Sequence, residues 1–147
     1  MPYKHLLVVV DLADGDDAAV EYAVNLAKSD GVKVKVAHLL EPIASIPTNR
    51  ELTEEETSKL EAHIVEAHKR MEPLSKKYPE HIKKEELIPA YGPPHMMIGM
   101  LAKEWKCDLV VVGDRSRRVQ DLVSPAPDDA AQDAMLDVLV VRTQKRE

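Results

Sequence analysis

One polar loop of this sequence carries residue types that could bind a phosphate group. The apolar run DLVVV ends at Gly113, and the next five residues include Ser116 and the arginines Arg115, Arg117 and Arg118. A guanidinium group can bind a phosphate through two parallel hydrogen bonds. The alternative interpretation is a solvated surface cluster. A single glycine after a strand usually marks a turn, and the motifs G-x-x-x-x-G-K-[ST] and G-x-G-x-x-G are both absent.

Acidic residues bear on the same question. Asp128 and Asp129 lie further along the chain and would oppose a phosphate in this loop. Like unit charges about 5 Å apart repel by roughly 0.8 kcal/mol in water, which weakens such a site without abolishing it. Asp11 follows another apolar run, HLLVVV. Its carboxylate could accept a hydrogen bond from a ribose hydroxyl or an adenine amino group, or it could instead organise the turn and cap the following helix.

The sequence offers no set of residues typical of a catalytic or metal site. His38 falls in an expected strand and is interpreted as a core or strand-end histidine. His63 and His68 are five apart on an expected helix and therefore lie on different faces. Cys107 precedes a buried strand and has no evident partner base, so we expect it to be buried. We therefore predict that the protein is not an enzyme and binds no metal.

Apolar strands alternate with amphipathic helices along the chain, which predicts a doubly wound parallel α/β sheet with right-handed crossovers. Pro73 is expected to kink or shorten the long second helix, and Pro89 places its strand at a sheet edge. The expected strands are residues 5–10, 32–40, 82–90, 108–113 and 138–141. The expected helices are residues 15–29, a long charged helix after a capping box at Thr53, a helix after Pro94 and a broken helix within 117–134.

In such sheets, ligands bind at the carboxyl ends of the strands. Three loops should meet at that edge here, and they begin at Asp11, Leu40 and Gly113.

Composition limits the possible classes of protein. The chain has 147 residues, so we expect one domain, 1–147. A net charge of −6 argues against a duplex nucleic-acid binder. No stretch reaches the roughly 20 apolar residues of a membrane span, and no signal peptide is recognised. The single cysteine fits a reducing compartment, so we expect a cytoplasmic protein without nucleic-acid or membrane partners.

Three stretches make residues 2–142 resemble the universal stress protein family. They are YKHLLVVVDLADGDDAAVEYAVNLAKSDGVKVKVAHLLEP, YGPPHMMIGMLAKEWKCDLVVVGDRSR and LDVLVVR. The resemblance implies an adenine nucleotide alpha hydrolase-like fold, with a five-stranded parallel sheet of order 3-2-1-4-5 and two helices on each face. It also implies a homodimer formed by antiparallel pairing of the last strands, and pairing would protect an apolar edge. The interface would then contain Val138, Leu139, Val140 and Val141.

Members of the family that bind ATP share a pattern of Gly, two residues, Gly, nine residues, and Gly followed by Ser or Thr. On this chain, Gly113 matches the first glycine, Ser116 stands at the second, and Ala126 and Pro127 stand at the final pair. The second glycine permits close backbone approach, and the final pair supplies an N–H and a hydroxyl to the phosphates. Pro127 supplies neither group.

The positions that would contact adenosine match the family better than the phosphate-binding pattern does. Asp11 and Leu39 match positions that would contact adenosine, and Gly92 matches the glycine that opens the third crossover. Together with Gly113, Arg115 and Ser116, these residues form a weak or lost nucleotide site.

The sequence therefore predicts a non-catalytic, cytoplasmic, homodimeric stress protein of the subgroup that does not bind ATP. It would use no cofactor and would act through unidentified protein partners. One alternative is a protein that binds AMP or ATP with magnesium, in which Arg115, Arg117 and Arg118 replace the missing backbone donors. A more distant alternative is an enzyme of the electron-transfer flavoprotein-like or adenine nucleotide hydrolase superfamily. The absent glycine run and the absent acid-base pair argue against that enzyme.

Overall fold

The strands form one parallel sheet. The computed structural model describes residues 3–13, 15–29, 31–123 and 136–143. The strands pair in the order β3-β2-β1-β4-β5, and all four pairings are parallel. This order confirms the fold predicted from the sequence. The strands are β1 (His5–Val10), β2 (Lys33–Leu39), β3 (Leu87–Ala90), β4 (Leu109–Gly113) and β5 (Asp137–Val141).

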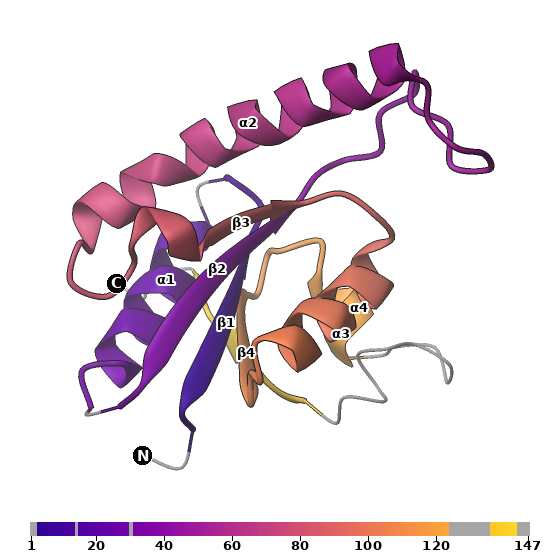
Figure 1. Cartoon of the computed structure of the whole chain (residues 1–147). Coiled ribbons are helices and arrows are strands. Elements are labelled where there is room, and N and C mark those ends of the chain that lie inside the picture. Colours follow the sequence, from indigo (N-terminus) through magenta and orange to yellow (C-terminus); the bar gives the residue numbers. More distant parts are fainter. Residues whose placement is uncertain (1–2, 14, 30, 124–135, 144–147) are drawn as a thin grey trace.

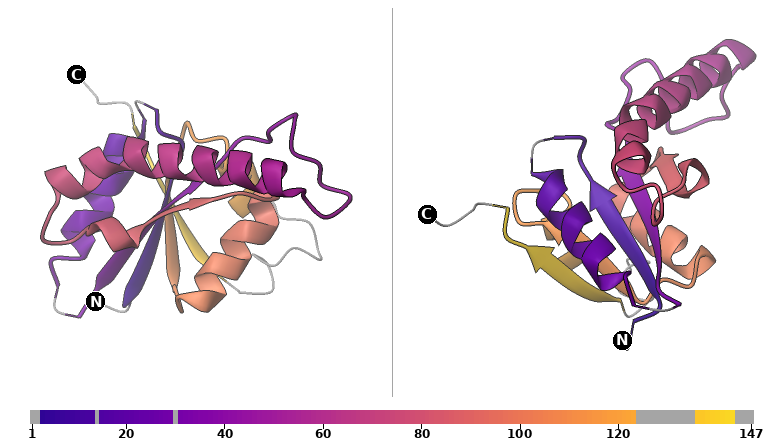
Figure 2. Two further views of the ribbon diagram at one scale, coloured as in Figure 1. Left: turned by 45° about the horizontal axis from the view of Figure 1, so that its top comes forward. Right: turned by 90° about the vertical axis from the view of Figure 1, so that its left-hand side faces the viewer.

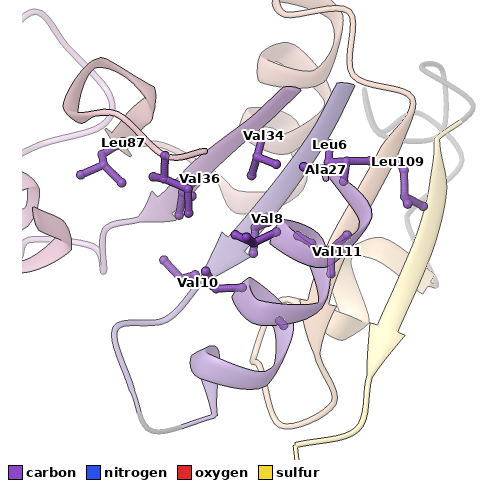
Figure 3. Close-up of a cluster of buried hydrophobic side chains, with 14 of the residues drawn as sticks. Leu6, Val8, Val10, Ala27, Val34, Val36, Leu87, Leu109 and Val111 are labelled. Atoms are coloured by element: carbon purple, nitrogen blue, oxygen red, sulfur yellow. The ribbon is translucent and has the colours of Figure 1, made fainter. Parts of the chain in front are cut away.

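Helices cover both faces of the sheet (Figure 2). Helices α1 (Asp16–Leu26) and α2 (Glu54–Lys77) pack on one face, and α3 (Pro94–Glu104) and α4 (Val119–Val123) pack on the other. Alternate residues of the central strands pack on opposite faces of the sheet. Leu6, Val8 and Val10 of β1 face α1 and α2 (Figure 3), whereas Leu7 and Val9 face α3 and α4. The β-branched runs therefore supply two apolar cores, which explains why no alternation is visible in the sequence.

The long helix α2 begins at the predicted capping box. The Glu56 backbone N–H donates to Thr53 Oγ1 over 3.1 Å, and the Thr53 N–H donates to Glu56 Oε1 over 3.0 Å. Arg50 also binds Glu56 at 2.8 Å, and this hydrogen bond is the main reason why the pKa of Glu56 falls to about 2. A helix of this length spans about 36 Å. Figure 1 shows its N-terminal end extending past the sheet, beside the loop that follows β2.

Most boundaries differ from those expected by three residues or fewer, and two regions need an explanation. Helix α2 continues four residues past Pro73, and Met71 and Ser75 on either side of the proline are buried, with Met71 packed into the core. Strand β3 begins at Leu87 instead of residue 82. The residues before it, Lys84–Glu86, form a 3-10 turn in which a Glu86 carboxylate oxygen accepts from the Lys83 N–H over 3.0 Å. The charged run KKEE has no apolar residues to bury, so it does not join the sheet.

Candidate functional site

The loops after β1 and β4 meet at the carboxyl edge of the sheet. These strands are neighbours, but α1 and α4 leave them toward opposite faces. The edge at this point is the topological switch point, where ligands bind in such sheets. The predicted residues Asp11, Arg115 and Ser116 lie in these two loops, and Gly113 is the last residue of β4.

The Asp11 carboxylate is bound by the loop after β4. Ser116 Oγ donates to Asp11 Oδ1 over 3.0 Å, and the Arg117 backbone N–H donates to Oδ2 over 3.0 Å. Ser116 Oγ in turn accepts from the Arg118 N–H over 3.0 Å. Both carboxylate oxygens of Asp11 therefore have partners within the chain. This arrangement matches the turn-organising alternative for Asp11.

Two of the three arginines have carboxylate partners. Arg117 forms an ion pair with Glu41, which lies in the loop after β2. Arg118 binds Asp121 on α4 at 3.3 Å. Arg115 forms no ion pair with any residue that the structure describes. A phosphate at this loop would therefore have to displace carboxylates from two of the guanidinium groups.

The Asp16 carboxylate, at the start of α1, binds the backbone of the loop after β1. Its Oδ1 accepts from the Asp11 backbone N–H, and its Oδ2 accepts from the Ala13 N–H, both over 2.9 Å. Leu12 between them has a φ of 60°, in the left-handed region. Burial raises the pKa of Asp16, although the hydrogen bonds from the backbone oppose this shift. Sequence reasoning did not assign Asp16 to the site.

Close packing explains the glycine at the end of β4. A Cβ added to Gly113 would lie 3.0 Å from Thr143 Cγ2 and 3.1 Å from the Gly15 carbonyl oxygen. The residue is therefore required by packing within the chain, whether or not a phosphate binds. Asp114 beside it accepts from both the backbone N–H and Oγ1 of Thr143, at 3.0 and 2.7 Å. These bonds lower the pKa of Asp114.

The remaining predicted residues lie on the other face or outside the described ranges. Leu39 is 5% exposed and packs into the core beneath α3 and α4. Gly92 has a φ of +152°, and a Cβ there would lie 2.9 Å from Met97 Sδ. Ala126 and Pro127 of the expected phosphate pattern fall in a part of the chain that the structure does not describe, as do Asp128 and Asp129.

A pocket of about 480 Å³ lies beside this network, between α2 and the carboxyl ends of β1 and β2. Of the six residues predicted for a nucleotide site, Asp11 is the one that lines it. His38, Glu66 and Arg70 also line it, and sequence reasoning did not assign them to a site. The available signal was the four-residue spacing of Glu66 and Arg70 on α2, but that spacing is typical of an ordinary surface ion pair.

The surroundings of His38 and Cys107 are those of residues that support the fold. His38 is 7% exposed, and its Nδ1 donates to the Val10 carbonyl over 2.9 Å, in line with a strand-end position. No group of three or more His, Cys, Asp or Glu side chains within the described ranges is arranged to hold a metal ion. Cys107 is half-buried, and mainly this burial raises the pKa of its thiol to about 11.

The last strand lies at the edge of the sheet. Among the strands that the structure describes, β5 pairs only with β4, and Figure 2 shows it at the side away from α2. Val138, Leu139 and Val141 are half-buried, while Val140 is 39% exposed. Among the helices that the structure describes, none combines the length and the apolar composition of a membrane span.

The strand order and the switch-point loops define an α/β protein of the adenine nucleotide alpha hydrolase-like class. A family model described as "Universal stress protein family" matches residues 2–142. The chain belongs to the universal stress protein family.

Solved structures of known proteins share this fold. A universal stress protein in complex with cAMP is 26% identical over 97% of this chain and 98% of its own, with a TM-score of 0.54. Universal stress protein UspA from Lactobacillus plantarum is 24% identical over 97% and 99%, with a TM-score of 0.57. A hypothetical protein whose function was assigned from its structure is 18% identical over 99% and 100%, with a TM-score of 0.67. The search of curated proteins gives no match.

Proposed function

We propose that this universal stress protein is a non-catalytic, cytoplasmic homodimer that does not bind ATP and acts through protein contacts. The observation that carries the proposal is the closed network at the switch point. Both Asp11 carboxylate oxygens accept hydrogen bonds from the loop after β4. Ser116 occupies the position where the ATP-binding pattern requires a glycine, and its side chain completes that network. A nucleotide would have to break it before binding.

Thermal unfolding with nucleotides tests this proposal. A ligand that binds only the native state stabilises it by about 2.7 kcal/mol at a hundredfold excess over Kd. We expect no rise in the melting temperature with ATP, AMP or either nucleotide plus magnesium. A clear rise that disappears in the Asp11→Ala variant would overturn the proposal.

The proposed dimer uses β5. Its outer edge has no paired strand among the described residues, and Val140 on this strand is an exposed apolar side chain. A second β5 strand could pair with this edge and cover that side chain. Light scattering should give the mass of a dimer, and Val140→Lys should shift it toward the monomer. A monomeric wild-type protein would rule out this part of the proposal.

Nucleotide binding through the arginines is the second candidate. Arg115, which forms no ion pair within the described ranges, and the 26% identical structure in complex with cAMP both favour it. In this case AMP or ATP with magnesium would raise the melting temperature, and Arg115→Gln would remove the effect. Lys106→Gln is a suitable control, because Lys106 lies at the other end of β4.

A further inference from the structure

The pocket beside α2 has an apolar wall, and its polar lining includes groups of His38, Glu66 and Arg70 that have no partner among the residues that the structure describes. It has a volume of about 480 Å³, which falls in the range typical of small-molecule sites. Leu40, Pro42 and Ile43 line one part of it. None of the predicted nucleotide residues Leu39, Gly92, Gly113 and Ser116 is among its lining residues. Asp11 and Arg117 of the switch-point network do line it, so the pocket adjoins that network and extends from it along α2.

Glu66 and Arg70 are exposed charged residues that line this pocket. They are four residues apart on α2, with the acid nearer the N-terminus, which is the order that favours an ion pair. Neither side chain forms an ion pair or a hydrogen bond with any residue in the described part of the chain. The Cβ atoms at this spacing are about 5–6 Å apart. The two charges can therefore converge on the two ends of one small ligand.

His38 contributes a third unpaired group. A carbonyl oxygen can only accept, so the bond from Nδ1 to the Val10 oxygen places a hydrogen on Nδ1. In the neutral ring, Nε2 is then an acceptor. It has no partner among the described residues, yet no fully buried side-chain polar atom in those ranges lacks a hydrogen bond. Nε2 therefore reaches solvent, and the pocket lined by His38 is where it can do so.

We propose that this pocket binds a free α-amino acid with an aliphatic side chain. Arg70 binds its carboxylate, and Glu66 and His38 Nε2 accept from its ammonium group. The aliphatic side chain lies against Leu40, Pro42 and Ile43.

The charge balance of the wall favours a zwitterion over other ligands. A ligand with one charge would leave either Glu66 or Arg70 unpaired. A polyphosphate would meet Asp11, Glu41 and Glu66, while Arg117 is already paired with Glu41. An α-amino acid carries one group of each sign on the same carbon atom, so its carboxylate can bind Arg70 while its ammonium group binds Glu66.

Isothermal calorimetry with leucine is the direct test. Two probes of nearly the same shape each lack one charge: 4-methylpentanoate has no ammonium group, and isoamylamine has no carboxylate. We expect leucine to bind, and both probes to bind at least about tenfold more weakly, since each loses charge-assisted hydrogen bonds. No heat with leucine up to about 10 mM, or equal binding of either probe, would overturn the proposal.

Matched variants separate the pocket from the rest of α2. Arg70→Gln and Glu66→Gln should each weaken leucine binding by about tenfold or more. Lys69→Gln and Glu61→Gln lie on the same helix but do not line the pocket, and they should bind leucine like the wild type. Circular dichroism establishes that all four variants are folded. Unchanged binding in folded Arg70→Gln would exclude the proposed site.

The His38→Asn variant tests the deepest contact. An asparagine amide can keep the hydrogen bond to the Val10 carbonyl but lacks the Nε2 acceptor. We expect weaker leucine binding with the melting temperature nearly kept. If folded His38→Asn binds leucine as tightly as the wild type, His38 has no part in the site.

Discussion

Two regions of the carboxyl edge differ in how their polar side chains are bound. We call the switch-point network the closed region and the Glu66–Arg70 part of the pocket the open region. At the switch point, Asp11, Ser116 and Arg117 bind one another, and Asp16 fixes the backbone of the neighbouring loop. Beside α2, Glu66 and Arg70 have no such partners among the described residues, although they line a pocket. The closed region is the one that the sequence pattern marks as a site. The open region carries no motif.

This difference teaches that a motif-like stretch can be used for internal structure. A hydrogen bond to a charged group typically contributes about 1.5–3 kcal/mol, so side chains in the closed region should support the folded state. Side chains in the open region should contribute little to it. Substitutions in the two regions should therefore affect stability very differently.

The largest effect is expected for Asp11→Ala. This change leaves Ser116 Oγ and the Arg117 N–H without their acceptor, and we expect the free energy of unfolding to fall by about 2–3 kcal/mol. Urea denaturation measures it. Asp11→Asn keeps one oxygen acceptor and should lose less. A stability of Asp11→Ala equal to that of the wild type would mean that the network is not formed in solution.

Gly113→Ala should have the next largest effect. The new Cβ would press on the Gly15 carbonyl and the Thr143 methyl group, and overpacking of this kind costs about 1–2 kcal/mol. Gly15→Ala is the matched control, because its Cβ would meet Thr143 Cγ2 at an ordinary 3.5 Å. Thermal unfolding of both variants should separate them, and equal losses would contradict the packing argument.

Thr143→Val should raise the pKa of Asp114 with little change in the fold. Hydrogen bonds from Thr143 lower the pKa of Asp114. The stability that they provide is present above the ordinary aspartate pKa and is lost as the pH falls through the lowered value. Valine removes the hydroxyl donor but keeps the backbone N–H, so the pKa of Asp114 should rise part of the way back. NMR titration of Asp114 measures this, and an unchanged pKa would show that the hydroxyl bond does not form.

The smallest effect belongs to the open region. Arg70→Gln and Glu66→Gln remove charges without ion-pair partners in the described ranges, so we expect changes in stability within about 0.5 kcal/mol. The same denaturation experiment provides the comparison with Asp11→Ala. A loss above 1 kcal/mol, about twice that range, would indicate that these charges support the fold after all.

Much of the fold could be predicted from the sequence. The apolar runs of β1 and β4 are continuous, which is typical of strands buried on both faces, and the helices show amphipathic spacing. The strand order came from the family resemblance. The start of β3 follows the charged run KKEE, which is visible in the sequence, whereas the end of α2 depends on tertiary contacts. Met71 and Ser75 are buried on either side of Pro73, and local propensity does not contain this information.

The candidate site was less accessible to sequence reasoning. Asp11 and Ser116 were identified, but their contact joins residues that are 105 positions apart. The Asp16 clamp depends on Leu12 adopting a left-handed backbone conformation, which leucine rarely does. The lining role of His38 and Arg70 depends on how α2 crosses the sheet, and this crossing is a property of the fold.

The single cysteine has a consequence for how this stress protein could respond to oxidants. Peroxides and disulfides react with the thiolate form of cysteine. With the pKa of Cys107 at about 11, the thiolate accounts for only about one molecule in ten thousand at pH 7. The side chain is therefore chemically quiet under conditions that modify exposed, acidic thiols. Direct oxidation of this protein at Cys107 would therefore be slow.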